Sequence, residues 1–383
     1  MKSRMSKGDG LKRRVVFVLQ DLGVGGAQRH TIGLVRDLRP RFDLVAVAHA
    51  SGISPGIVGP DVMESVLVLG QSGLLNPLKW VRIGRAIASL KPDLVVSINQ
   101  IASILIFICS LLGLLRCPRA VIFHTTDVRD SAGWIRTIPF FPAVWASDCL
   151  IYISANQARL WKARGLFGRR TETIRNGIDH KSFRIPDAET KVAARSRLGL
   201  DVDDFVIGMS AVLRSEKNHL QMVEALAILR RDIPKARLLL IGDGPMRPEI
   251  EKRVGELGLG PYVLFAGMQN DVRPFLDAVD VGVLCSTAVE TLSLSALEAM
   301  AMGIPMVMSD IGGASEIVSH GENGFLFQAG DTPALVAALA ECAPASRREV
   351  LSRNAAATVA RDFRHEKMLE SYVSLFESLF QKK

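Results

Sequence analysis

The sequence predicts an α/β protein made of two Rossmann-like, doubly wound parallel-sheet domains that face each other across a cleft. Its 383 residues are too many for one compact core and suit two domains. Short apolar and β-branched runs alternate with amphipathic stretches, as in parallel sheets covered by helices. A polar stretch, 187–200, interrupts this alternation, which then starts again. We therefore expect two sheets in tandem, bridged by that stretch.

The first half of the chain carries the first alternation. Strands are expected at 15–19, 43–48, 67–69, 94–98, 120–123, 149–153 and 173–174. Amphipathic helices are expected between them at 27–39, 77–90, 101–115, 134–146 and 155–164. Because each pair of neighbouring strands is separated by a helix-length segment, the strands are expected to run parallel.

The second half repeats this pattern and ends on a helix. Strands are expected at 205–210, 237–241, 263–266, 279–285 and 305–308, with helices at 219–230, 246–257, 272–278, 294–302 and 332–340. The last segment, 364–380, carries an apolar stripe of Met368, Tyr372, Leu375, Phe376 and Leu379. No strand follows this helix, so its stripe must be buried on a part of the chain that is already folded.

Charge and cysteine content narrow the class of partner. The net charge of +8 and the pI of about 9.4 favour anionic partners, such as a phosphorylated substrate or an anionic membrane. Nucleic acid is not expected, because the chain has no zinc-finger or helix-turn-helix signal and only 6% aromatic residues. Five scattered cysteines without a C-x-x-C pair fit a reducing compartment and argue against a cysteine zinc site.

One segment raises the question of a membrane. The stretch 101–115 is almost wholly apolar, but spanning a bilayer takes roughly 20 residues. We expect a buried or interfacial helix, and the arginines that follow it suggest peripheral contact with an anionic membrane. The basic start, 1–14, is expected to be a flexible leader, since the apolar run 15–19 is too short for a signal peptide.

Residues with chemistry are expected in the loops that follow strands, because ligands of open α/β sheets bind at the carboxyl ends of strands. The first such loop, 21–28, contains Gly25 and Gly26, which let the backbone turn sharply or approach a ligand. It does not match G-x-G-x-x-G, and a plain glycine turn is the alternative. His124 follows another strand, where it can bond a sugar hydroxyl or relay a proton, or is satisfied by local backbone. The Asn-Gly pair in 174–179 indicates a tight structural corner.

The second domain opens with cations at a strand end. Arg214 and Lys217 suit a diphosphate, since Arg grips two oxygens and Lys acts as a point charge. Solvated surface charges are the alternative. Gly242 and Gly244 end the next strand, either for close approach of the backbone to a ligand or as a turn only.

The stretch 290–303, E-T-L-S-L-S-A-L-E-A-M-A-M-G, holds the strongest candidate site. It predicts a loop and then a helix, with hydroxyl side chains for the N-cap and Gly303 after the last turn. A helix N-terminus at a strand end is a natural phosphate site. Glu290 and Glu298 bracket this end, and simple exposure of both carboxylates is the alternative.

Together these motifs resemble the retaining glycosyltransferase family 4, the glycogen-synthase-like group with the GT-B fold. The matching pieces follow the family's order from about residue 23 to 327. They are G-G-A-Q-R-H, R-N-G-I-D, E-K-N, I-G-D-G-P, the E-x7-E of Glu290 and Glu298, L-E-A-M-A-x-G-x-P, G-G-x-x-E and N-G-F-L-F.

The resemblance implies a UDP- or GDP-linked sugar as donor, retention of configuration, and no metal or other cofactor. Lys217 and Arg214 would neutralise the donor diphosphate, helped by backbone N–H groups of Thr291, Leu292, Ser293 and Leu294, with Ser295 completing that turn. Glu298 would accept from the ribose, and Glu290 would contact the transferred sugar. His124 and the Gly25–Gly26 loop would lie across the cleft, and Gly242 and Gly244 would approach the donor.

The same resemblance assigns the parts of the chain. Residues 1–185 would form an acceptor-side domain, 186–360 a donor domain, and 361–383 a helix that packs back on the first domain. Separately, the apolar stretch 101–115 and the basic first half of the chain favour a saccharide or lipid-linked acceptor used in cell-envelope polysaccharide or glycolipid assembly, and an enzyme that works in the cytoplasm, peripherally at the inner membrane face.

Two departures from the family pattern stand out. The pattern G-R-L-x-x-E-K places Arg where this chain has Val212, and Arg214 comes two positions later. The common E-G-F-G-L loop reads E-T-L-S-L here, without its two glycines. Two other functions therefore stay open: a nucleotide-sugar epimerase or hydrolase on the same fold, and a nucleotide-sugar-binding subunit without catalysis.

Overall fold

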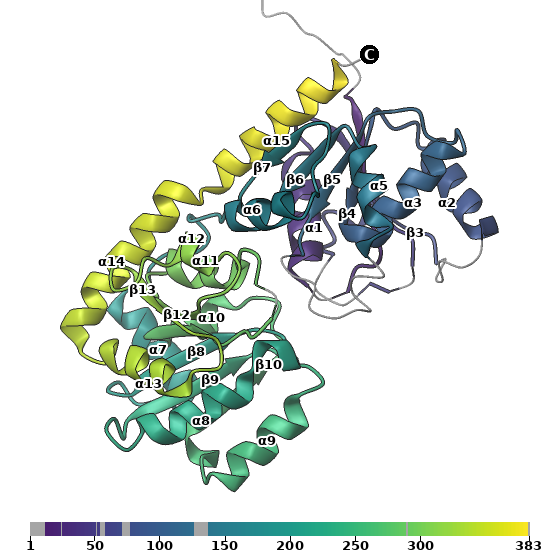
Figure 1. Ribbon diagram of the computed structural model, residues 1–383. Coiled ribbons are helices and arrows are strands. Elements are labelled where there is room, and N and C mark those ends of the chain that lie inside the picture. Colours follow the sequence, from purple (N-terminus) through teal and green to yellow (C-terminus); the bar gives the residue numbers. More distant parts are fainter. Residues whose placement is uncertain are drawn as a thin grey trace, which may run out of the picture.

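A computed structural model describes residues 12–23, 25–50, 52–53, 58–70, 77–125, 137–288 and 290–381 (Figure 1). The two expected sheets form two lobes, and the last two helices run along the outside of the molecule from the second lobe to the first. Residues 1–11 of the expected leader, and the first residues of the helix expected at 134–146, lie outside the described residues.

Within the described ranges, seven parallel strands form the first sheet, in the order β3-β2-β1-β4-β5-β6-β7. The strands are β1 Arg14–Leu19, β2 Asp43–Ala48, β3 Val66–Val68, β4 Leu94–Ile98, β5 Arg119–Phe123, β6 Cys149–Tyr152 and β7 Thr171–Thr173. The helices are α1 Gly26–Asp37, α2 Pro77–Ser89, α3 Asn99–Leu111, α5 Phe140–Trp145 and α6 Ala155–Ala163, with a 3₁₀ turn at Met63–Ser65.

Strand β1 shows why this sheet is covered on both faces. Phe17 and its alternate neighbours pack into one core with α1, while Val16 and Val18 pack into another with α2 and α3. Successive side chains of a strand point to opposite faces, so an unbroken apolar run requires helices on both sides. The uninterrupted hydrophobicity of 15–19 is therefore explained by its central position in the sheet.

In the described part of the second domain, six parallel strands follow the order β10-β9-β8-β11-β12-β13. They are β8 Phe205–Ser210, β9 Ala236–Ile241, β10 Val263–Gly267, β11 Val281–Leu284, β12 Met306–Ser309 and β13 Gly324–Phe327. The helices are α7 Ala188–Arg197, α8 His219–Leu229, α9 Arg247–Glu256, α10 Arg273–Leu276, α11 Leu294–Ala301, α12 Ala314–Ile317, α13 Thr332–Glu341, α14 Ala345–Asp362 and α15 His365–Phe380, with 3₁₀ turns at Ser215–Lys217 and Gly260–Tyr262.

The last two helices belong to different domains. Helix α14 buries Ala355 and Val359 in the core of the second sheet. Helix α15 instead lies along the first domain (Figure 1). It buries Tyr372 and Phe376 against the first sheet, in one core with Phe17. This confirms that the terminal helix crosses back. The domain boundaries expected at 185 and 360 stay predictions.

Some elements differ from expectation. The stretch expected as a polar bridge contains helix α7, which follows the N-cap Asp187 and buries only Ala194 and Arg195. Strand β13 and helix α14 were not expected at all. The strand has only four residues and begins at a glycine, and the helix buries only three of its residues, so both patterns are weak.

The apolar stretch expected as a helix at 101–115 forms α3, which packs against the first sheet through Leu105 and Ile106. No helix in the described part of the chain is long and apolar enough to cross a membrane.

The order of strands in each sheet reverses at one point. In the first sheet this switch lies between β1 and β4, and in the second between β8 and β11. Loops that leave neighbouring strands there diverge and open a crevice at the carboxyl ends, which is where open α/β sheets bind ligands. The two crevices face each other.

Candidate functional site

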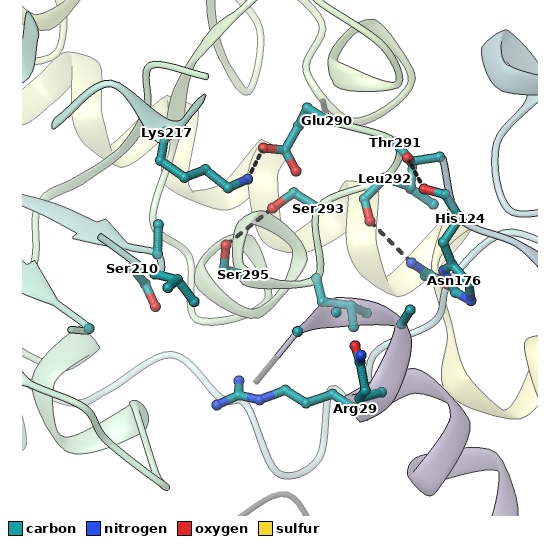
Figure 2. A pocket seen from close by; sticks show the side chains of 18 of the residues that line it. Arg29, His124, Asn176, Ser210, Lys217, Glu290, Thr291, Leu292, Ser293 and Ser295 are labelled. Carbon is teal, nitrogen blue, oxygen red and sulfur yellow. Dashed lines mark hydrogen bonds and ion pairs between the residues drawn. The ribbon is translucent and has the colours of Figure 1, made fainter. Parts of the chain in front are cut away.

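A pocket of about 390 Å³ lies where the two crevices meet. The first domain lines it with the loop after β1 and the start of α1, together with Asn99, His124 and Asn176. The second domain lines it with the ends of β8 and β9, Lys217, and the loop 290–295 before α11. Figure 2 shows these side chains converging on one space from both domains.

Lys217 and Glu290 form an ion pair on the second-domain wall. The Lys217 Nζ lies 2.6 Å from the Glu290 Oε2 (Figure 2). The Ser286 hydroxyl donates to the same oxygen at 2.8 Å. Glu290 is only 7% exposed. The alternative of a solvated loop glutamate is therefore wrong, and the carboxylate is held in one place by two donors.

The loop that carries Glu290 packs against Gly313, which precedes α12. The N–H of Gly313 donates to the Glu290 carbonyl at 3.1 Å. A Cβ at Gly313 would overlap the Thr291 carbonyl oxygen, so only glycine permits this approach. Ser293 is the N-cap of α11 and accepts from the N–H of Ala296 at 3.3 Å. The helix thus begins at the pocket, with its positive end toward the cavity.

The two residues that replace glycine in this loop use their side chains inside the protein. Ser293 caps α11, and the Thr291 hydroxyl donates to the carbonyl of His124 at 2.6 Å. Asn176 adds a second link across the cleft, since its Nδ2 donates to the Leu292 carbonyl at 3.1 Å. The E-T-L-S-L loop is therefore tied to the first domain rather than left free over the pocket.

His124 lies at the end of β5, opposite this loop. Its N–H donates to Asn99 Oδ1 at 2.8 Å, and its carbonyl accepts from Thr291, so its backbone is fixed from both domains. Its ring meets the ring of His30 edge-on, with centroids 5.2 Å apart. Burial lowers the pKa of His124 to about 4, which keeps the imidazole neutral near pH 7. Among the described residues its Nε2 has no hydrogen-bond partner.

The glycines of the pocket serve different purposes. At Gly26 an added Cβ would meet no atom within 4 Å, so its open face belongs to the cavity. At Gly25 that space is occupied by the Gln28 side chain. Gly242 has a φ of 144°, and a Cβ there would overlap the Ala211 carbonyl, so it permits close approach of two loops.

Known proteins agree with this architecture. The model of "Glycosyltransferase Family 4" matches residues 24–182, and that of "Glycosyl transferases group 1" matches 191–357. The lipopolysaccharide core biosynthesis glycosyltransferase LpsD of Rhizobium meliloti (strain 1021) is 30% identical over 92% of this chain and 95% of its own length.

The chain belongs to glycosyltransferase family 4.

This confirms the resemblance, the enzyme class and the GT-B fold. Some relatives match over less of their length: the match to EpsD of Bacillus subtilis (strain 168), at 34% identity, covers 55% of this chain and 56% of EpsD. Among solved structures, Anabaena HepE in complex with UDP covers 95% of this chain and 100% of its own, with a TM-score of 0.82 at 22% identity. WaaG, a glycosyltransferase involved in lipopolysaccharide biosynthesis, has a TM-score of 0.74 at 15% identity and covers 93% and 98%.

Not every residue expected at the family 4 site lines the pocket. Arg214 is exposed and lies off the described lining, and Gly244 instead packs on the Leu213 backbone. Glu298 lines a neighbouring hollow between α1, α11 and α15. Burial is the main cause that raises the pKa of Glu298 to about 7. The pocket and this hollow share Arg29 and Leu294.

Arg29 and Asn176 are among the pocket residues of this family 4 protein that were not expected there. Arg29 stands inside the G-G-A-Q-R-H motif, and the motif spacing alone gave no reason to single it out. Asn176 was expected only as a structural corner, but its amide also forms part of the pocket wall. An amide at a domain crossing is a signal that could have pointed to Asn176, since such crossings border the cleft of a two-domain protein.

Proposed function

We propose that this chain transfers a sugar from a UDP- or GDP-linked donor to a saccharide or lipid-linked acceptor, with retention of configuration. The observation that carries the proposal is the pocket at which both switch points meet. It combines an ion-paired lysine and a helix N-terminus from the second domain with a half-buried, neutral histidine from the first. The lysine and the helix N-terminus suit a diphosphate, and the histidine suits a sugar hydroxyl.

The neighbours support a nucleotide-sugar donor. HepE is solved with UDP, with UDP and glucose, and with UDP-glucose. One relative, LpsB of Rhizobium meliloti (strain 1021), is named as a lipopolysaccharide core biosynthesis mannosyltransferase, and another, from Escherichia coli, as a galactosyltransferase for GlcNAc-diphosphoundecaprenol. We infer from these names that the acceptor belongs to envelope polysaccharide or glycolipid assembly.

In the proposed reaction, the acceptor oxygen bonds to the anomeric carbon while the bond from that carbon to the β-phosphate oxygen breaks. The electron pair stays on the phosphate, and the acceptor proton passes to the leaving phosphate oxygen on the same face. Lys217 and the N-terminus of α11 stabilise the charge that develops there. Glu290, held by Lys217 and Ser286, accepts from hydroxyls of the transferred sugar.

His124 orients the sugar from the opposite wall. Because it is neutral, it can accept a hydrogen bond at one nitrogen and donate at the other. We assign no metal to this reaction, since side-chain cations supply the positive charge. Turnover that is unchanged by EDTA is expected, and loss of turnover that Mg²⁺ restores would contradict this part of the proposal.

A donor and acceptor screen tests the proposal. Purified protein is incubated with UDP- and GDP-sugars, with and without a saccharide acceptor, and nucleotide release is measured. Release that depends on the acceptor, with an α-linked product from an α-linked donor, is expected. Release without an acceptor would indicate a hydrolase, and tight binding without turnover would indicate a binding subunit.

We also propose that the enzyme works on the cytoplasmic face and contacts an anionic membrane through the first domain. Leu111, at the end of α3, is 70% exposed, and Trp145, at the end of the adjacent α5, is 49% exposed. Exposed cations, including Arg116 and Lys162, lie on the same domain. Apolar side chains beside cations favour an anionic lipid surface.

Vesicle pelleting tests this contact. We expect binding to anionic vesicles, weaker binding to neutral ones, and a loss in the double variant Leu111→Ser/Leu112→Ser. Both leucines are exposed, so the fold should not depend on them. Absence of binding to either kind of vesicle would contradict the membrane proposal and leave the transferase proposal intact.

A further inference from the structure

The second domain brings little positive charge to the pocket. The family pattern has an arginine at position 212, but here Val212 lines the cavity. Arg214 is exposed and lies off the lining, so Lys217 is the only cation among the described lining residues of the second domain. Lys217 is already paired with Glu290. A donor with two negatively charged phosphate groups therefore meets a single lysine whose charge is shared.

Arg29 supplies a second cation from the other side of the cleft. It lies in the first turn of α1, and its side chain lines the same pocket as Lys217 and Val212. Figure 2 shows its guanidinium extending away from α1, on the side of the cavity opposite Glu290. Within the described ranges the guanidinium has no hydrogen bond and no ion pair, unlike Arg36 on the same helix, which is paired with Asp37 at 2.9 Å.

We propose that Arg29 binds the diphosphate of the donor and takes the place of the arginine that the family pattern puts at position 212. This rests on the proposed transferase function and deepens it. A guanidinium presents a planar fork of donors that matches phosphate oxygens, and it loses its water more readily than an ammonium because it is more weakly hydrated. The donor would then be gripped by both domains at once, Lys217 from one and Arg29 from the other.

Glu298 is the competing partner for Arg29. It lines the adjoining hollow that also includes Arg29, and the guanidinium favours its charged form. If Arg29 serves only to pair with Glu298, then Glu298→Gln and Arg29→Gln should have the same consequence. If Arg29 binds the diphosphate, then removing its charge should weaken nucleotide binding more as the number of phosphates in the nucleotide increases.

Calorimetric titration with UDP and GDP tests the assignment. For whichever nucleotide the wild type binds, Arg29→Gln should weaken the diphosphate roughly tenfold or more, the value for loss of a charge-assisted hydrogen bond. The affinity for the corresponding monophosphate should fall less, and the affinity for the nucleoside should not change. Arg36→Gln, on the same helix but paired with Asp37, is the matched control and should bind as the wild type does.

A charge transplant gives the decisive comparison. In the double variant Arg29→Gln/Val212→Arg the cation returns from the second domain, and most of the lost diphosphate affinity should return with it. Melting temperatures close to that of the wild type show that each variant is folded.

Three outcomes would count against the assignment. Diphosphate affinity of Arg29→Gln equal to that of the wild type overturns it, as does an equal loss for the nucleoside and the diphosphate. A loss in Glu298→Gln of the same size and the same phosphate dependence assigns Arg29 to Glu298 instead. If the wild type binds no nucleoside diphosphate at all, the proposed function itself fails, and Arg29 with it.

Discussion

The two walls of the cleft differ in how far their polar groups are already partnered. On the second-domain wall Lys217, Ser286 and Glu290 bond one another, and Ser293 caps its helix. On the first-domain wall, among the described residues, Arg29 has no hydrogen bond or ion pair, and one ring nitrogen of His124 and the Oδ1 of Asn176 have no hydrogen-bond partner. The first arrangement is preorganised, whereas the second leaves donors and acceptors for a ligand to complete.

This difference says where binding energy and catalysis should reside. Groups that are fixed before the substrate arrives need no reorganisation when charge develops, so they contribute to the chemical step as well as to donor binding. Groups without partners gain their hydrogen bonds only from the ligand, so they contribute to affinity and domain closure. Substitutions on the two walls should therefore have different kinetic signatures.

The largest effect is expected for Lys217→Ala. It removes the charge nearest the donor phosphates and also leaves the buried Glu290 without its cation. Donor affinity should fall by about 2–3 kcal/mol, roughly 30- to 150-fold, in calorimetric titration. Lys235→Ala, which removes an exposed lysine paired with exposed Asp203, is the control. Unchanged donor affinity in Lys217→Ala would show that the lysine has no cationic role.

Glu290→Gln should separate turnover from binding. The amide keeps the shape of the side chain but loses the charge that Lys217 and Ser286 hold in place. We expect kcat to fall about 10²-fold, as when one preorganised polar group is lost, while donor affinity changes little. Glu251→Gln on α9 controls for a lost carboxylate far from the cleft. Equal losses in kcat and in donor affinity would instead indicate a simple binding role.

Thr291→Val tests the link between the walls with a smaller effect. Valine has the shape of threonine but cannot donate to the His124 carbonyl. Loss of this hydrogen bond should cost about 1 kcal/mol and lower kcat roughly fivefold, with donor affinity nearly unchanged. Thr291→Ser, which keeps the hydroxyl, should restore the rate, and Thr358→Val on α14 should have no effect on kcat. If Thr291→Ser is as slow as Thr291→Val, packing rather than the hydrogen bond matters.

The smallest effect is expected for the pH dependence of stability that comes from a pair between α1, the helix that carries Arg29, and α15. Asp37 on α1 bonds His365 on α15, with Oδ2 and Nε2 2.9 Å apart. This hydrogen bond raises the pKa of His365, so the folded state binds its proton more tightly than the unfolded chain does. The stabilisation is therefore complete below the unfolded pKa of about 6.5 and is lost as pH rises through the higher folded value.

Melting curves across this pH range measure that contribution. Because the pair is partly exposed, we expect at most about 1 kcal/mol. His365→Gln should flatten the decline of stability between pH 6 and 8. A decline as steep in the variant as in the wild type would assign the pH dependence to other groups.

The site residues that could be predicted are those whose place follows from the strand pattern alone. Lys217, Glu290 and His124 each follow a strand, and parallel strands bring such loops to one edge of a sheet. Which side chains reach across the cleft could not be predicted in this way, because it depends on how the two domains are placed relative to each other. That is why Arg29 was missed and why Arg214, a cation in a suitable loop, faces solvent instead.

Hydrogen bonds between the two domains could not be predicted from the sequence either. The Glu316 carboxylate of the G-G-x-x-E motif accepts from the N–H groups of Ala155 and Asn156 at the start of α6. Both partners are ordinary motif or helix-start residues, and 160 positions separate Asn156 from Glu316. Local pattern carries no information about such a pairing. It also gave no signal for α14, whose charged surface hides a narrow buried stripe.

Paired crystal structures, without nucleotide and with UDP or GDP, test the difference between the walls most directly. We predict that the loop from Glu290 to Ser295 and the Lys217–Glu290 pair stay in place, while the Arg29 guanidinium moves onto the diphosphate. In a further structure with the nucleotide-sugar donor, the ring of His124 should gain a hydrogen-bond partner from the sugar. A rearranged 290–295 loop, with Arg29 still in solvent, would contradict the account.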